Sequence, residues 1–123
     1  MGGQAFARAA AHDRAGREAE AIPEYEEALR LGLRDEVRRQ ALLGLGSSLR
    51  NVERFDDAVA VLEDACARFP DDHALRAFRA LAVASAGRCE RALGDALLLV
   101  AEQVELGGYE RALREYAGKL AAR

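Results

Sequence analysis

Apolar residues recur every three or four positions along almost the whole chain, and glycines interrupt this pattern at short intervals. The breaks fall at Gly16, Gly32, Gly87 and the pair Gly107 and Gly108. A period near 3.6 residues is that of an amphipathic α-helix, and glycine commonly follows the end of a helix. The pattern predicts seven helices, at roughly 3–15, 18–31, 35–51, 55–69, 73–86, 89–105 and 108–121.

No segment predicts a β-strand. The alternating stretch "AVAVL" at 58–62 lies inside a longer helical pattern. The predicted loops are only a few residues long, so consecutive helices are expected to pack as antiparallel hairpins. Asp35 and the pair Asp71 and Asp72 stand where helix N-caps are expected. Without a low-complexity linker, the chain is predicted to form a single domain over residues 1–123.

The helical pattern repeats. Segments 16–32, 53–69 and 87–103 align without gaps, and Ala21, Ala58 and Ala92 coincide in that alignment. A helix–turn–helix unit of about 34 residues is the period of tetratricopeptide repeats. The middle unit carries the characteristic small and apolar residues of that repeat at Leu42, Leu45, Gly46, Leu49, Ala58, Leu62, Ala65 and Pro70.

Packing explains these residue types. Gly46 and Ala58 are expected where two antiparallel helices approach closely, because a larger side chain there would overpack the contact at a cost of roughly 1–3 kcal/mol. Leucines fill the space around that contact. Pro70 is expected to end its helix, since proline cannot continue one.

The chain resembles small bacterial tetratricopeptide-repeat (TPR) proteins. More narrowly, "SSLRN" at Ser47–Asn51, "LRAFRAL" at Leu75–Leu81 and the closing helix Tyr109–Leu120 are similar to a family of about this length. The resemblance covers nearly the whole chain. It implies an all-α, right-handed superhelix (an α-solenoid) that serves protein interaction without catalytic residues. The expected units are three antiparallel helix pairs, at 3–32, 35–70 and 73–106, and a C-terminal capping helix at 108–121.

Two apolar segments near the C-terminus leave alternatives open. Tyr109, Leu113, Tyr116 and Leu120 form one stripe on the last helix, which is expected to cover the open end of the third pair or to mediate dimerisation. Residues 97–100 cover most of a helix circumference, which predicts burial nearly all round. Either the third pair and the last helix enclose this segment, or the second subunit of a homodimer does.

Composition and charge narrow the function. Half of the 123 residues are hydrophobic and about a third are charged, with a net charge of −3. This balance argues against nucleic-acid binding, which needs a face rich in Lys and Arg. No apolar run is long enough to span a membrane, and the N-terminal residues lack a secretory pattern. We therefore expect a cytoplasmic protein.

The sequence offers few groups for catalysis. His12, His73, Cys66 and Cys89 are scattered, and the repeat geometry suggests no catalytic arrangement of them with the serines at 47 and 48. There is no metal-ligand spacing and no glycine-rich phosphate loop. We expect no cofactor, no metal and no enzymatic activity.

The distribution of charge suggests a binding face. The predicted first helices of the pairs carry an excess of arginine, whereas the second helices carry an excess of Asp and Glu. First helices line the concave face of a helical-repeat array, so we expect a mildly basic groove that binds an acidic peptide or a C-terminal carboxylate of a protein partner. Candidate residues are Ser47, Arg50, Asn51, Arg76 and Arg79. The alternative for Arg50 and Asn51 is that they cap their helix.

Overall fold

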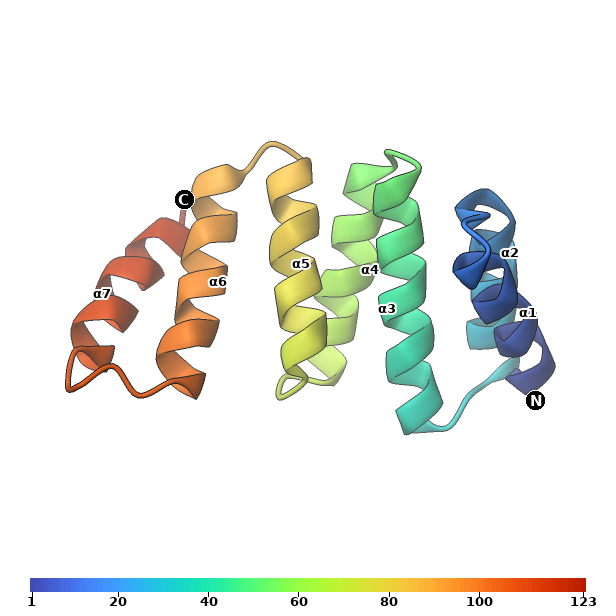
Figure 1. Cartoon of the computed structure of the whole chain (residues 1–123), viewed down its shortest axis with the longest axis horizontal. Coiled ribbons are helices and arrows are strands. Elements are labelled where there is room, and N and C mark those ends of the chain that lie inside the picture. Colours follow the sequence, from blue (N-terminus) through green and yellow to red (C-terminus); the bar gives the residue numbers. More distant parts are fainter.

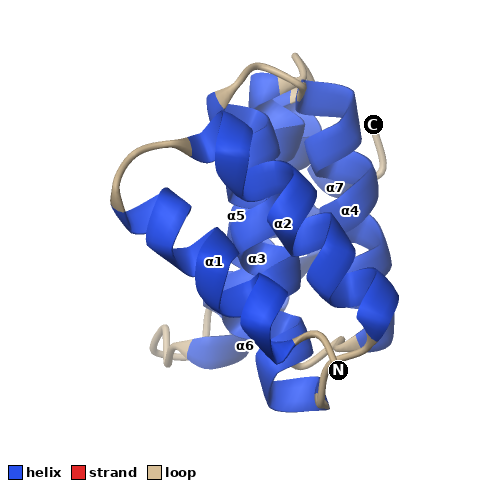
Figure 2. Cartoon of the chain, turned by 90° about the vertical axis from the view of Figure 1, so that its right-hand side faces the viewer, coloured by secondary structure: helices blue, strands red, loops and turns tan.

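The computed structural model describes all residues 1–123 and contains seven α-helices and no strand (Figures 1 and 2). The all-α prediction is confirmed, and each predicted helix lies within two residues of an observed one. The helices are α1 (Gly3–Arg14), α2 (Glu18–Leu31), α3 (Asp35–Asn51), α4 (Phe55–Arg68), α5 (His73–Ser85), α6 (Cys89–Gln103) and α7 (Glu110–Ala121).

The helices form an extended array in chain order. Each helix packs against the next, and the first helices α1, α3 and α5 also contact one another in turn. The two termini lie at opposite ends of the long axis (Figure 1). The last helix departs from this order, because α7 contacts α6 and no other helix.

The turn inside each helix pair has the same geometry three times. Gly16, Glu53 and Gly87 adopt positive φ angles of 75°, 65° and 91°. In each turn the following residue donates its N–H to the carbonyl oxygen five residues earlier. This left-handed conformation normally favours glycine. The repeated turn confirms the alignment of segments 16–32, 53–69 and 87–103.

Alanines and leucines build the core. Ala21, Ala58 and Ala65 are almost fully buried among leucines such as Leu62. At Gly46, an added Cβ would lie only 2.5 Å from Cγ of Leu62, so the predicted close approach of α3 and α4 is present. Small residues therefore set the helix separation, and the leucines fill the space beside them.

Only one of the two expected N-cap positions is correct. The Asp72 carboxylate accepts a hydrogen bond from the Leu75 N–H at 3.0 Å and caps α5. Asp35 instead occupies the first turn of α3, which begins without a side-chain cap. There its charge still favours the helix, because the N-terminal end of a helix dipole is positive.

Of the two alternatives left open for residues 97–100, enclosure of α6 by the chain itself is incomplete. Only Ala92 of this helix belongs to the main apolar core, and the side chains of Leu93 and Val100 are exposed. Residues 97–99 are only partly buried. The cause is the position of α7, which covers one side of α6 and leaves another side open.

Candidate functional site

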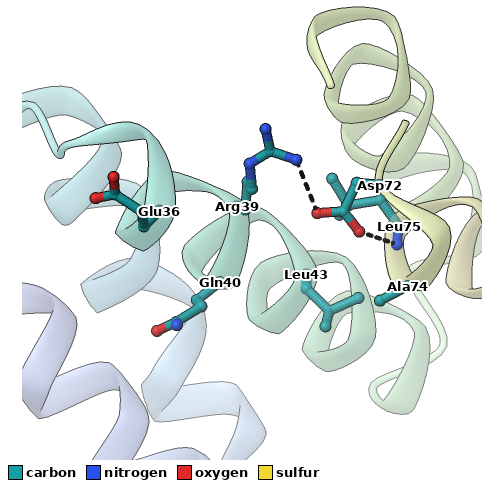
Figure 3. A pocket seen from close by; sticks show the side chains of 7 residues that line it. All are labelled: Glu36, Arg39, Gln40, Leu43, Asp72, Ala74 and Leu75. Carbon is teal, nitrogen blue, oxygen red and sulfur yellow. Dashed lines mark hydrogen bonds and ion pairs between the residues drawn. The ribbon is translucent and has the colours of Figure 1, made fainter. Parts of the chain in front are cut away.

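Two adjoining hollows form a groove along α3, on the side where the first helices meet. The first lies between α3 and the start of α5 (Figure 3). The second lies between α3, the α1–α2 pair and the middle of α5. Both share Gln40 and Leu43 of α3, so we treat them as one surface and call it the α3–α5 groove. Its lining consists of Asp13, Tyr25, Glu36, Arg39, Gln40, Leu43, Gly44, Ser47, Asp72, Ala74, Leu75 and Phe78.

The α5 end of the groove is held by Asp72. One of its carboxylate oxygens caps α5, and the other accepts a hydrogen bond from Nη1 of Arg39 at 3.3 Å (Figure 3). The Arg39 guanidinium also lies 4.2 Å from the centre of the Phe69 ring, within the range of a cation–π contact. Arg39 is therefore occupied by structural contacts.

Tyr25 forms the other wall of the groove. Its ring reaches from α2 to Gly44 of α3, and its hydroxyl donates a hydrogen bond of 2.8 Å to the Asp13 carboxylate. Burial raises the pKa of Tyr25, and the hydrogen bond and negative charge of Asp13 raise it further. The phenol thus remains protonated and keeps Asp13 at the groove edge.

The middle of the groove combines apolar side chains with unpaired polar groups. Leu43 and Phe78 are half-buried and offer an apolar surface. The amide of Gln40 and the hydroxyl of Ser47 make no hydrogen bond within the chain. Amide and hydroxyl groups both donate and accept hydrogen bonds, which suits them to a peptide backbone.

Arg50 and Asn51 lie beyond Ser47 on α3. Nε of Arg50 donates a hydrogen bond of 2.8 Å to the hydroxyl of Ser85 on α5, and its terminal nitrogens have no acceptor. Asn51 is exposed and makes a long contact of 3.5 Å with Glu18. Arg50 is thus oriented across the end of the groove with donors to spare, whereas Asn51 faces α2.

Arg76 and Arg79 lie elsewhere. Arg76 forms an ion pair of 2.5 Å with Glu102 on α6. Arg79 is partly buried, and its Nε has no hydrogen-bond partner. Its charge acts on the buried Cys66 thiol, where it opposes the larger effect of burial, which raises the pKa of Cys66. The structure therefore does not bring these two arginines together with Ser47 and Arg50.

The charge difference between first and second helices has a structural cause. Arg8 of α1 pairs with Glu24 of α2, and Arg76 of α5 pairs with Glu102 of α6. In both cases an arginine of a first helix meets an acidic residue of the second helix of its own pair. The groove lining itself carries three acidic residues, Asp13, Glu36 and Asp72, and a single arginine. The expected basic character is absent from it.

The remaining reactive groups do not converge. Nδ1 of His12 accepts a hydrogen bond from Arg17, and Cys66 is buried while Cys89 is exposed. No three His, Cys, Asp or Glu side chains lie together in a way that could hold a metal ion. None of the seven helices is both long and apolar enough to cross a lipid bilayer.

A comparison with protein families gives a match over residues 2–120, to the model described as "Tetratrico peptide repeat". The chain belongs to the tetratricopeptide-repeat family. A comparison with curated proteins gave no match. The TPR chain is thus a helical-repeat module of the kind that serves protein interaction, as its sequence resemblance implied.

Most groove residues of this TPR chain were not among the predicted candidates. Gln40, Leu43 and Ser47 are spaced three and four residues apart, which places them on one side of α3 and could have been noticed in the sequence. Phe78 and Tyr25 carry no such signal. They join the groove only because α2 and α5 both pack against α3.

Proposed function

We propose that this TPR protein is a non-catalytic interaction module that binds an extended peptide segment of a protein partner in the α3–α5 groove. The observation that carries the proposal is the pair of unpaired polar groups, Gln40 and Ser47, on either side of the half-buried Leu43. Peptide backbones require hydrogen-bond partners, and apolar surface beside them accommodates a side chain. The groove lies on the side of the first helices, the concave side in this architecture.

The charge of the groove shapes the expected ligand. Three acidic residues line it, so a peptide that is acidic along its length would be repelled. Arg50 stands at one end, with terminal nitrogens free and Nε fixed by Ser85. We therefore infer a neutral or basic peptide whose C-terminal carboxylate is bound by Arg50, because guanidinium groups bind carboxylates with two parallel hydrogen bonds.

A non-catalytic role agrees with the placement of the titratable groups. A nucleophile and its base must come within hydrogen-bond reach of each other. Cys89 is exposed, and its only polar contact is with the carbonyl oxygen of Ala84 at 3.8 Å. His12 contacts Arg17, and His73 is exposed at the start of α5.

The test is a selection from a displayed library of random peptides with free C-termini, followed by affinity measurements on a selected peptide. Ser47→Trp fills the groove and is expected to weaken binding by at least about tenfold, the equivalent of about 1.4 kcal/mol. Ala60→Trp, on the exposed side of α4, is the matched control and should bind as the wild type does. Equal binding by Ser47→Trp would contradict the groove as the site.

The role of Arg50 is tested with the same peptide in two forms, the free acid and the C-terminal amide. Wild type is expected to prefer the free acid, and Arg50→Gln to remove that preference while leaving the amide form unaffected. Arg76→Gln serves as the control, because Arg76 is paired with Glu102 outside the groove. An unchanged preference in Arg50→Gln would exclude the carboxylate contact.

A further inference from the structure

The exposed large apolar side chains are concentrated at one end of the molecule. Apart from Met1, all of them lie on or directly beside α5, α6 and α7: Leu81, Leu93, Val100, the α6 C-cap Val104, the α7 N-cap Tyr109, and Tyr116. A continuous exposed apolar surface on a soluble domain usually marks an interaction site, whereas single exposed side chains do not. This end of the array therefore requires an explanation.

The repeat register explains why these side chains are exposed. Leu93 and Val100 of α6 occupy the positions of Val59 and Cys66 in α4, 34 residues earlier. Val59 and Cys66 are 4% and 5% exposed, whereas Leu93 and Val100 are 52% and 40% exposed. In α4 these positions are buried because the next first helix, α5, packs there. In α6 no helix occupies the equivalent place, which we call the vacant seat.

The last helix lies beside the vacant seat. A Cβ on Gly94 of α6 would lie 2.6 Å from the carbonyl oxygen of Ala117 and 2.8 Å from Cα of Ala121, so α7 crosses α6 at Gly94. The equivalent residue of α4, Ala60, is exposed. The contact between α6 and α7 therefore uses a side of the second helix that is exposed to solvent in α4. Figure 1 shows α7 beside α6, away from α5, and α7 makes no contact with α5.

The vacant seat has the shape of a helix-binding site. Leu93, Leu97, Val100 and Val104 follow one another at spacings of four, three and four residues and form a stripe along α6. Leu81 of α5 is also exposed and occupies the position that Ser47 has in α3, 34 residues earlier. This is the arrangement that α4 and α3 present to α5 in the preceding repeat, so the occupant that fits is an amphipathic helix antiparallel to α6.

The last helix carries an apolar stripe that is only partly covered by its own chain. Tyr109, Leu113, Tyr116 and Leu120 repeat the same spacing on α7, and the two tyrosines are 73% and 64% exposed. Helical wheels of the antiparallel α6 and α7 place this stripe and the vacant seat on the same side of the hairpin. Tyrosine at such a position is typical of protein interfaces, because its ring offers a large rigid contact.

We propose that the vacant seat is filled by α7 of a second copy of this chain, in a symmetric dimer in which each copy provides one seat and one α7. A two-fold axis makes the two contacts identical, so a single stripe and a single seat are sufficient. In this arrangement the stripe of α7 with Tyr109 and Tyr116 packs antiparallel against Leu93 and Val100 of the partner's α6.

The first test is sedimentation equilibrium of the full chain over a range of concentrations. Wild type is expected to dimerise, and Val100→Glu to raise the dissociation constant at least about 100-fold, because it would bury an unpaired carboxylate in the seat. Ala60→Glu, at an exposed position of α4, should dimerise normally. Circular dichroism confirms that both variants keep their helices. A wild type that stays monomeric, or a dimer that tolerates Val100→Glu, overturns the proposal.

The second test examines whether α7 is the helix that fills the seat. Tyr116→Glu, in the exposed stripe of α7, should raise the dissociation constant at least about 100-fold, because it would bury an unpaired carboxylate in the partner's seat. Arg111→Glu, on the opposite side of α7, is the matched control and should dimerise normally. A dimer that tolerates Tyr116→Glu would exclude α7 as the occupant of the seat. Peptide binding in the α3–α5 groove uses different residues, so Ser47→Trp should leave dimerisation unchanged and Val100→Glu should leave peptide binding unchanged.

Discussion

The ring of Tyr25 occupies the space that a side chain at position 44 would need. A Cβ on Gly44 would lie 2.5 Å from the Tyr25 hydroxyl oxygen and 2.9 Å from Cε1 of its ring. Glycine inside a helix normally costs stability relative to alanine. Here Gly44 leaves room for the ring of Tyr25 on α2, whose hydroxyl donates a hydrogen bond to Asp13 of α1. The three residues join α1, α2 and α3 at the groove.

Gly44→Ala should therefore destabilise the protein although alanine favours helices. The gain in helix propensity is about 1 kcal/mol, and displacement of a buried ring costs about 1–3 kcal/mol, so a net loss of about 1 kcal/mol is expected. Gly118→Ala is the matched control, because no atom lies within 4 Å of its added Cβ. That variant should gain stability. Urea denaturation measures both, and a more stable Gly44→Ala would show that Tyr25 moves away freely.

The hydrogen bond from Tyr25 to Asp13 should make stability depend on alkaline pH. The pKa of Tyr25 is raised in the folded state from an ordinary value of 10.0. The stabilisation is therefore fully present below pH 10.0 and is lost as pH rises further, because only the unfolded chain then releases the proton. Tyr25→Phe should lower the free energy of unfolding by about 1 kcal/mol at neutral pH. It should also remove the part of the stability loss at alkaline pH that Tyr25 causes. The free energy of unfolding, measured from pH 8 to pH 11 in roughly half-unit steps, checks this.

Glu53→Gly should stabilise the middle repeat. Glu53 is the only non-glycine residue with a positive φ, and the equivalent turns use Gly16 and Gly87. A left-handed conformation costs a residue with a side chain about 1–2 kcal/mol, part of which is offset by the greater freedom of glycine in the unfolded chain. We expect a net gain of about 0.5–1 kcal/mol in thermal or urea unfolding. Glu26→Gly, in the middle of α2, should instead lose stability.

The α6–α7 hairpin should open more easily than the rest of the array. Ala92 is its only residue in the main buried core, and ion pairs from Arg91 to Glu63 and from Arg76 to Glu102 also attach α6 to α4 and α5. Ion pairs near the surface weaken with added salt. Hydrogen exchange of the Val100→Glu variant should therefore be faster in residues 89–121 than in α3 and α4, and salt should increase the difference.

A substitution separates this effect from ordinary fraying of a chain end. Arg91→Ala should accelerate exchange throughout the hairpin and leave α3 unchanged. Arg30→Ala removes the exposed pair with Glu27 inside α2 and should alter neither region. Equal protection of α6 and α3 in the Arg91→Ala variant would mean that apolar packing alone holds the hairpin.

The sequence by itself determined the helices and the repeat. Helix periodicity, glycine at the ends and the spacing of Ala21, Ala58 and Ala92 are local or nearly local signals, and they predicted seven helices and the TPR family. Local signals suffice there because a helix is specified by residues three and four positions apart, and a solenoid packs each helix mainly against its neighbours in the sequence.

Only the tertiary structure decided which side chains meet across helices. Arg76 was grouped with Arg50 from its place on a first helix, yet it points to Glu102 because α5 turns that side toward α6. Leu93 and Val59 occupy equivalent positions, yet their exposure differs because α7 crosses α6 at Gly94 and misses the place that α5 takes on α4. A rotation or displacement of one helix changes which stripe of side chains is buried and which is exposed. The apolar periodicity within a helix does not reveal that rotation or displacement.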